Sequence, residues 1–374
     1  MSGYKKIKVV ICINDFLVGG AQQLIVDILA RIDRTRFEPV LVTLFDFGER
    51  QYLYDAVPDG IPVYRIKFSS IRDMRAWREL YRTLHRTNPD VVLSNLFFTN
   101  TITRVLAPFF RYRVITVEHN TYTKKTKFHQ LIDRILSPLS ARIVAVSKTV
   151  AIFTAKQENI RTDKFVVINS GIDAAVLRAR AARSDPTETR RALGLAPEDH
   201  AIIDVARAVP QKNYPLLLEG FALFAPKHPA YMLLIAGLGK SLENIQTYTR
   251  ELGIQDRVMF LGYQKNLPAV LAVCDFFVST SLIEGFGIAH AEALACGLPV
   301  LTTKTAGPDE MIKEGVNGFF IPEYSKEAVA ASLAKMAAQD LAPMRAASPR
   351  SVERYSTERT VKAYEKLFEE TAAV

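Results

Sequence analysis

TSLIEGFGIAHAEALACGLPVL, residues 280–301, reads as the end of a buried strand, a glycine-containing loop, a helix and the start of another strand. The strongly apolar runs DFFVSTS (275–281) and LPVLTT (298–303) lie at its two ends. Strands covered by helices on both faces have this character, because neither face is polar. The stretch therefore predicts a strand–helix–strand unit of a parallel sheet.

The same alternation of apolar runs and helical patterns extends along all 374 residues, a length that suggests two domains. We therefore expect an α/β fold with two doubly wound parallel sheets. The predicted domains are residues 1–170 and 200–355, joined by a linker over 171–199, with a final helix over 356–374 that crosses back to the first domain. The other expected strands span 6–13, 37–45, 90–95, 113–118, 141–147, 201–206, 231–237 and 257–262.

Composition narrows the class of protein. With 49% hydrophobic and 23% charged residues, the chain is globular rather than disordered, collagen-like or coiled-coil. Its three cysteines, Cys12, Cys274 and Cys296, have neither a disulfide framework nor zinc-site spacing, which favours the reducing cytoplasm. We find no apolar run long enough for a signal peptide or a membrane span, so a soluble or peripheral protein is expected.

Charge is distributed unevenly. Residues 1–185 contain 29 Lys and Arg against 17 Asp and Glu, a balance of +12, whereas the remainder has 19 against 22. The first half is therefore expected to meet an anionic partner. Nucleic acid is not that partner, because aromatic residues do not interleave with the basic ones as they do in a stacking platform.

Residues 280–301 also contain candidate ligand-binding groups. Glu284 precedes the predicted helix and Glu292 lies one to two turns inside it. Carboxylates accept several charge-assisted hydrogen bonds from sugar hydroxyls, and the amides of Phe286, Gly287 and Ile288 open a helix N-terminus suited to phosphate or sugar hydroxyls. Helix-capping glutamates are the alternative interpretation.

Two further segments follow predicted strands. Gly19 and Gly20 begin an amphipathic helix, where their amides could approach an anion, although a plain strand-to-helix turn would look the same. Arg207 and Lys212 lie at the carboxyl edge of a predicted sheet, the edge at which open α/β sheets bind ligands. They could neutralise a diphosphate or be solvated loop cations.

Taken in their order along the chain, the segments around Gly19, Arg207 and Glu284 resemble those of retaining GT-B glycosyltransferases of glycosyltransferase family 4. The resemblance covers nearly the whole chain, and the Glu-x(7)-Glu element is its most specific part. It also includes GGA (19–21), GLGKSLENI (237–245), LGY (261–263), AGPDEMI (306–312) and GVNGFFIP (315–322). The resemblance implies two Rossmann-like domains facing a central cleft, the first binding the acceptor and the second binding a nucleotide-sugar donor.

The family's roles carry over by position. Gly19 and Gly20 would lie against the donor diphosphate, and His119 in TVEHN near the anomeric centre, unless it is an ordinary histidine at a strand end. Arg207 and Lys212 would hold the leaving phosphates, Glu284 the sugar hydroxyls and Glu292 the ribose. His290 stands where the family usually has an apolar residue and is assigned no role. Because the chain contains no Asp-x-Asp pair, we expect neither a metal nor another cofactor.

Two basic segments could contact the acceptor or a membrane. In IRDMRAWRELYRTLHR (71–86), Arg72, Arg75, Arg78 and Arg82 share one side of a predicted helix, opposite an apolar stripe. They are either solvated or interfacial on anionic lipid. Lys124, Lys125 and Lys127 open the next amphipathic helix, where the helix dipole disfavours cations unless an anion such as a lipid diphosphate is bound.

The expected function is transfer of a sugar from a nucleotide-sugar, preferably a UDP-sugar, to a polyprenyl-diphosphate-linked glycan at the inner face of the plasma membrane. The alternatives are a soluble acceptor, a nucleotide-sugar epimerase of the same fold, and a sugar-binding protein without catalysis.

Overall fold

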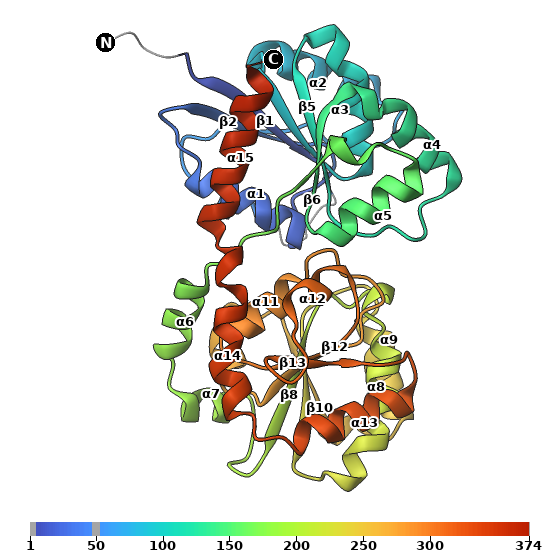
Figure 1. The fold of residues 1–374 in the computed structure, drawn as a ribbon, viewed down its shortest axis with the longest axis vertical. Coiled ribbons are helices and arrows are strands. Elements are labelled where there is room, and N and C mark those ends of the chain that lie inside the picture. Colours follow the sequence, from blue (N-terminus) through green and yellow to red (C-terminus); the bar gives the residue numbers. More distant parts are fainter. Residues whose placement is uncertain (1–4, 47–52, 374) are drawn as a thin grey trace. The chain divides into compact units, whose positions relative to one another are not determined.

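The computed structural model describes residues 5–46 and 53–373 and divides the chain into two compact units. Met1–Gly171 and Thr357–Val374 form the first unit, and Ile172–Ser356 form the second. Each unit contains one parallel sheet with helices packed on it (Figure 1). The expected fold class, α/β with two doubly wound parallel sheets, is confirmed.

The sheet of the first unit has seven strands. They are β1 (Ile7–Ile13), β2 (Phe37–Thr43), β3 (Val63–Arg65), β4 (Val91–Asn95), β5 (Arg113–Glu118), β6 (Ser140–Ala145) and β7 (Phe165–Val167). Their order is β3-β2-β1-β4-β5-β6-β7, and every neighbouring pair is parallel. The chain reverses its direction of winding between β1 and β4, and such a switch point is where ligands bind in open α/β sheets.

Helices pack on both faces of this sheet. On one face, α2 (Met74–Thr87) and α3 (Phe97–Phe110) share a core with Val10 and Val92 of the strands. On the other, α1 (Gly20–Arg31) packs against α15 (Thr357–Ala372), which also contacts β1 and β4. The unit is completed by α4 (Lys127–Leu136) and α5 (Lys148–Glu158). Tyr364 and Phe368 of α15 are fully buried, so the C-terminal helix is part of this unit's core.

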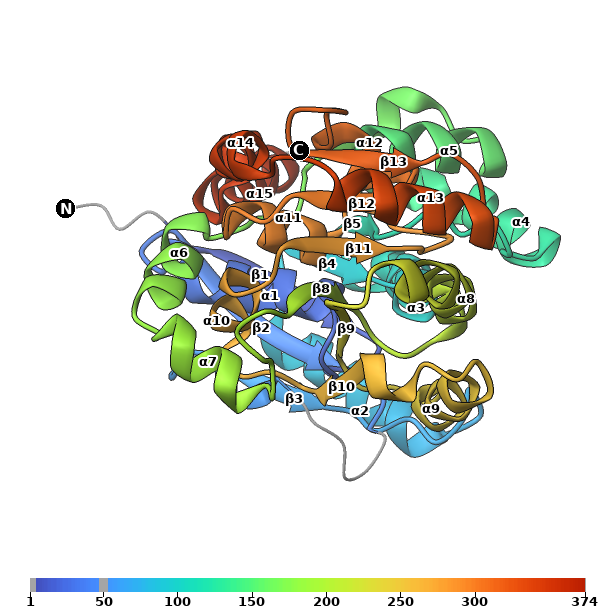
Figure 2. The same cartoon turned by 90° about the horizontal axis from the view of Figure 1, so that it is seen from below.

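The second unit has six parallel strands in the order β10-β9-β8-β11-β12-β13. They are β8 (His200–Val205), β9 (Tyr231–Ala236), β10 (Val258–Gly262), β11 (Phe276–Ser279), β12 (Val300–Thr303) and β13 (Gly318–Ile321). One face carries α8 (Tyr214–Phe224), α9 (Leu242–Glu251) and α13 (Lys326–Ala337), and the other carries α10 (Leu267–Ala272), α11 (Ile288–Ala295) and α14 (Ala342–Val352) (Figure 2). A short helix, α12 (Ala306–Met311), follows β12.

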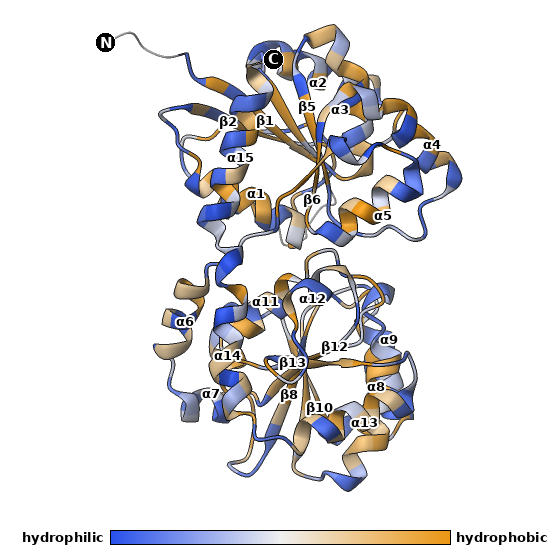
Figure 3. Ribbon diagram, in the orientation of Figure 1, coloured by the Kyte–Doolittle hydropathy of each residue, from blue (hydrophilic) through white to orange (hydrophobic). Residues whose placement is uncertain are grey.

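The strands at the centres of both sheets coincide with the apolar runs of the sequence (Figure 3). Sequence analysis missed β3, β7 and β13, and all three are edge strands of three or four residues. A short strand at an edge is covered less completely, and β3 and β7 accordingly have no buried residue. Without a continuous apolar run, their pattern resembles that of a loop.

The stretch expected to be a linker, residues 171–199, has regular structure instead. It contains α6 (Ala174–Ala182) and α7 (Pro186–Ala192), which belong to the second unit and pack against α10 and α11. Aspartates cap both helices, because Asp173 accepts the amide of Val176 and Asp185 accepts those of Thr187 and Glu188. Neither helix has a fully buried residue, so the sequence contains no strong apolar pattern that would predict them.

Candidate functional site

Two loops at the carboxyl edge of the second sheet form one structure. The loop after β8 ends in the 3₁₀ turn Pro210–Lys212, and the loop after β11 runs from Thr280 to Gly287. The amide of Leu282 donates to the carbonyl of Gln211 (2.9 Å), and the hydroxyl of Thr280 donates to that of Asn213 (3.1 Å). These bonds hold the two segments that carry Lys212 and Glu284 in fixed register.

Lys212 and Glu284 form a nearly buried ion pair. Lys212 Nζ lies 2.5 Å from Glu284 Oε1, and their side chains are 14% and 12% exposed. The hydroxyl of Ser281 donates to the same oxygen at 2.8 Å. Oε2 accepts no hydrogen bond from the described residues, so it is the oxygen available to a ligand hydroxyl.

The Glu284 carboxylate stays ionised although it is buried. Burial by itself would raise its pKa, but the ammonium of Lys212, with smaller contributions from His290 and Ser281, holds the pKa below its usual value. An ionised carboxylate accepts hydrogen bonds without donating any. Glu284 is therefore matched to a partner that presents O–H groups.

The N-terminus of α11 follows this pair directly. Its N-cap residue, Gly287, has φ +84°, a left-handed conformation that favours glycine, and no side chain caps the helix. Gly307 packs closely against the same loop and leaves no room for a side chain, because a Cβ at this position would lie 1.9 Å from the carbonyl oxygen of Phe286. The Phe286 ring is buried against Tyr355, so only its backbone can serve a ligand.

Arg207 lies in the same loop as Lys212 but is exposed. Its neighbours continue the sheet ladder, since the amide of Ala206 bonds the carbonyl of Ala236 and that of Ala208 bonds the carbonyl of Leu238, both at 3.0 Å. The backbone is thus held, while no hydrogen bond or ion pair joins the Arg207 guanidinium to the rest of the described chain. Glu292, one turn inside α11, is half-buried.

In the first unit, His119 directly follows β5. Its Nε2 lies 2.9 Å from Asn95 Oδ1, while Asn95 Nδ2 donates to the carbonyl of Cys12 at 3.2 Å. Because the amide nitrogen is used on Cys12, Oδ1 must accept, and Nε2 therefore carries the proton. Burial lowers the pKa of His119 to about 4, so the ring is neutral at physiological pH and Nδ1 can accept a hydrogen bond.

Gly19 and Gly20 begin α1 at the same edge of the first sheet. Gly19 is the N-cap in an extended conformation that any residue can adopt, and no side chain caps the helix. Asn14, in the loop before them, accepts hydrogen bonds from the amide (3.1 Å) and the hydroxyl (2.5 Å) of Thr99 in α3. This ties the glycine loop to the start of α3, where Leu96 has the unusual φ of +73°.

Known proteins that resemble the chain share this architecture. A family model described as Glycosyltransferase Family 4 matches residues 18–176, and one described as Glycosyl transferases group 1 matches residues 185–351. The chain is 24% identical over 317 residues to the UDP-Gal:alpha-D-GlcNAc-diphosphoundecaprenol alpha-1,3-galactosyltransferase of Escherichia coli, a match that covers 82% of this chain and 81% of that protein. Together the two models match most of the chain, which is a glycosyltransferase of the group 1 and family 4 type.

Further matches agree with this family. A glycosyltransferase of Methanocaldococcus jannaschii is 27% identical over 211 residues, 56% of this chain and 54% of that protein, so the match spans about half of the relative. Among solved structures, Anabaena HepE in complex with UDP and glucose has a TM-score of 0.86 at 19% identity, over 97% of this chain and 100% of HepE. That similarity establishes the GT-B fold.

Lys125 of this family 4 glycosyltransferase does not lie where the sequence placed it. Expected on the surface beside an acceptor or membrane, its side chain is only 8% exposed and pairs with Asp133 and Glu158. Asp133 also pairs with buried Arg104, and Glu118 is buried near the group. The anionic partner expected for Lys125 is thus supplied by the protein's own acidic side chains.

The other basic residues are on the surface. Arg72, Arg75, Arg78 and Arg82 are exposed on and before α2, and Lys124 and Lys127 are exposed before and at the start of α4. The apolar side of α2 packs only in part, because Leu80 and Leu84 are buried whereas Met74 and Tyr81 are exposed. Solvated arginines and an interfacial helix therefore both remain compatible with α2.

Sequence reasoning missed several polar partners of the site in this glycosyltransferase. Asp204, near the end of β8, is buried, which raises its pKa to about 7, and it lies within electrostatic reach of Lys212 and Glu284. His290 is buried with Nε2 3.0 Å from Thr302 Oγ1, which itself donates to the Thr303 carbonyl. In the sequence, Asp204 and His290 are each marked only by being a single polar residue within a largely apolar stretch. Among residues 5–46 and 53–373, no three His, Cys, Asp or Glu side chains are grouped to hold a metal ion.

Proposed function

We propose that this protein is a retaining glycosyltransferase that moves a hexosyl or N-acetylhexosaminyl group from a UDP-sugar to a lipid-linked saccharide. The observation that carries the proposal is the Lys212–Glu284 pair beside the uncapped N-terminus of α11. It combines donors for a diphosphate with an ionised acceptor for sugar hydroxyls. The crystal structures of HepE with UDP and glucose and with UDP-glucose support the choice of a UDP-sugar.

The donor diphosphate would be held by cations and amides. The Lys212 ammonium has three N–H donors, of which the observed pair uses one for Glu284. The remaining donors, the exposed Arg207 guanidinium and the first amides of α11 suit phosphate oxygens. Glu284 Oε2 would accept a hydroxyl of the transferred sugar, and Glu292 would accept a ribose hydroxyl.

The proposed reaction uses these positions. The bond between the anomeric carbon and the β-phosphate oxygen breaks while the acceptor oxygen bonds to the same carbon from the same face. The acceptor proton passes to the departing phosphate, whose growing negative charge Lys212 and Arg207 stabilise. His119 would accept a hydrogen bond from a hydroxyl near the reacting carbon through Nδ1, because Nε2 is used on Asn95.

A lipid-linked acceptor is supported by two observations. The Escherichia coli relative is named for its GlcNAc-diphosphoundecaprenol acceptor. The exposed arginines of α2, with Lys124 and Lys127, give the first unit a basic surface for the inner face of the plasma membrane. No helix of the described chain has the length and hydropathy of a membrane span. The basic surface is the basis on which we propose peripheral attachment.

The test is a transfer assay with UDP-, GDP- and ADP-sugars and GlcNAc-diphosphoundecaprenol, with the anomeric configuration of the product read by NMR. We expect Lys212→Met and Glu284→Gln each to lower kcat about 100- to 1,000-fold. Lys227→Met and Glu198→Gln change exposed residues outside the two loops and should retain activity. Activity should also survive EDTA.

Equal activity in all four variants would refute the assignment of Lys212 and Glu284. An inverted product would refute the retaining mechanism, and full loss of activity in EDTA that manganese restores would refute the metal-free mechanism. Absence of transfer from every donor would refute the transferase proposal itself.

A further inference from the structure

A cavity lies in the first unit, at the opposite edge of the sheet from His119. It has a volume of about 580 Å³ and is bounded by α3, the starts of β5 and β6, the segment before β7, and α15. Arg113 is the first residue of β5 and Ser140 the first of β6, whereas His119 follows the last residue of β5. The cavity is therefore separate from the proposed reaction site.

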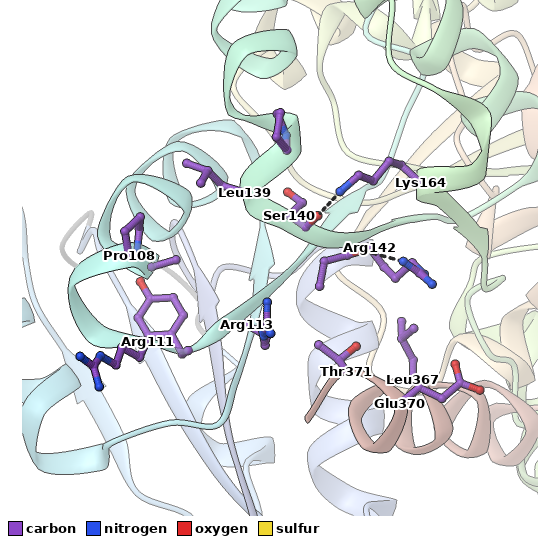
Figure 4. Close-up of a pocket in the computed structure, with 14 residues that line it drawn as sticks. Pro108, Arg111, Arg113, Leu139, Ser140, Arg142, Lys164, Leu367, Glu370 and Thr371 are labelled. Atoms are coloured by element: carbon purple, nitrogen blue, oxygen red, sulfur yellow. Dashed lines mark hydrogen bonds between the residues drawn. The ribbon is translucent and has the colours of Figure 1, made fainter. Parts of the chain in front are cut away.

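Cationic side chains dominate this cavity. Arg111, Arg113, Arg142 and Lys164 surround it, against the single carboxylate of Glu370 (Figure 4). The four come from the turn after α3, from β5, from β6 and from the residue before β7, so folding gathers them from distant parts of the chain. Glu370 itself lies 3.7 Å from Lys366, which offsets part of its charge.

At least three of these cations keep their charge uncompensated. Lys164 Nζ donates to the carbonyl of Ser140 (2.8 Å), and Arg142 Nη1 donates to that of Ala141 (3.0 Å). Backbone carbonyls carry no net charge, so these bonds orient the cations without neutralising them. The Arg111 side chain has no hydrogen-bond or ion-pair partner within the described part of the chain. Uncompensated cations around a concave site favour an anionic ligand.

Leu139 in the cavity wall, and two apolar residues close in sequence to other lining residues, are exposed. Leu139 lines the cavity and is 40% exposed. Phe109, adjacent to the lining residue Pro108, is 79% exposed, and Ile135, in the last turn of α4, is 63% exposed. A small soluble anion would leave these side chains in water, whereas a bilayer interface would cover them. Cations around the cavity and exposed apolar side chains close to it in sequence together match a lipid with a phosphate headgroup.

We propose that this cavity binds the phosphomonoester headgroup of a membrane lipid, with Phe109, Ile135 and Leu139 entering the interface. A phosphomonoester carries more charge and more free oxygens than the phosphodiester of most lipids, which suits four basic side chains against one carboxylate. The cavity volume admits a headgroup rather than a phosphate ion alone. This inference deepens the proposed peripheral attachment and rests on it, while the lipid here is an anchor and not the acceptor.

The experiment is co-sedimentation of the full chain with phosphatidylcholine vesicles containing phosphatidic acid or phosphatidylglycerol, at matched surface charge and without donor. We expect roughly tenfold tighter binding to phosphatidic acid, the scale of one charge-assisted hydrogen bond. Arg111→Gln/Arg142→Gln should abolish this preference but retain binding to phosphatidylglycerol. The matched control Arg75→Gln/Arg78→Gln should weaken binding to both vesicles and keep the preference.

Equal binding to the two anionic vesicles, or a preference that persists in Arg111→Gln/Arg142→Gln, would overturn the cavity site alone. Absence of binding to every vesicle would overturn the peripheral attachment as well. Glycerol 3-phosphate is the soluble probe, and calorimetric binding of it without any vesicle binding would assign the cavity to a soluble phosphate and overturn the lipid. Arg111 and Arg142 are exposed, so their variants should fold, and circular dichroism checks this.

Discussion

Lys124 and Lys125 are adjacent and carry the same charge, but the structure predicts opposite results when each is replaced by methionine. Lys125 lies in a buried cluster with Asp133, Glu158, Glu118 and Arg104, whereas Lys124 is exposed. Methionine is unbranched and flexible, so it retains most of the packing of the lysine stem. The difference between the two variants therefore isolates the buried charge.

The magnitude follows from the charge balance of this cluster. Lys125→Met leaves three buried carboxylic groups facing a single guanidinium, and breaking a buried pair costs about 3–5 kcal/mol of unfolding free energy. For a unit of this size, that loss lowers Tm by about 6–20 °C. Lys124→Met should stay within about 0.5 kcal/mol of the wild type. Because carboxylates can take up protons, the effect of Lys125→Met should be smaller near pH 5 than near pH 8.

Tryptophan fluorescence during urea unfolding is a suitable assay, because Trp77 is the protein's one tryptophan and packs in the core of the first unit. The signal reports this unit separately from the second. The double variant Lys125→Met/Glu158→Gln should recover part of the stability, since it removes both partners. Equal unfolding free energies for Lys125→Met and Lys124→Met would refute the reasoning.

Two further predictions concern Glu158 and Gly307. Burial raises the pKa of Glu158 to about 8, so the folded protein holds a proton that the unfolded chain releases above its ordinary pKa near 4.5. The free energy of unfolding should therefore fall as pH rises between these two values, by at most about 1.4 kcal/mol per pH unit. Glu158→Gln should remove this slope. Parallel pH–stability profiles for the two proteins would contradict it. A Cβ at Gly307 would lie 1.9 Å from the Phe286 carbonyl oxygen, so Gly307→Ala should cost the second unit about 1–3 kcal/mol in calorimetry and raise the KM for the donor. An unchanged KM with unchanged Tm would show that the loop does not depend on this contact.

The sequence was most informative where burial is complete. The central strands of both sheets are apolar on both faces, so their runs indicated strands without ambiguity. Edge strands such as β3 and β7 lack that cover, and α6 and α7 have no fully buried residue. Because the edge strands and these two helices are partly exposed, they lack a strong apolar pattern. The sequence therefore did not predict the edge strands, and it indicated a linker in place of the two helices.

In the candidate site, sequence motifs located the loops but not the partners of their side chains. The Lys212–Glu284 pair spans 72 residues of sequence and the Asn95–His119 bond spans 24, so neither follows from local spacing. Topology creates both contacts by placing the carboxyl ends of β8 and β11, and of β4 and β5, next to each other. The order of the motifs was therefore enough to identify these residues as site candidates. The position of the proton on His119 Nε2 could be assigned only from the contact with Asn95.

Charge balance distinguishes two partly buried lysines that were both expected to meet an anion, Lys212 the donor phosphates and Lys125 an acceptor or membrane. Lys125 pairs with Asp133 and Glu158 and lies near Glu118, and these carboxyl groups raise its pKa against the effect of burial, so its ammonium is already stabilised within the protein. Within residues 5–46 and 53–373, Lys212 forms an ion pair with Glu284 only, and its other acidic neighbour, Asp204, has a pKa raised to about 7, which leaves that group partly neutral. The uncapped amides of α11 and the unpaired Arg207 add positive potential beside Lys212. We therefore expect an anionic ligand at the Lys212 site and none at Lys125.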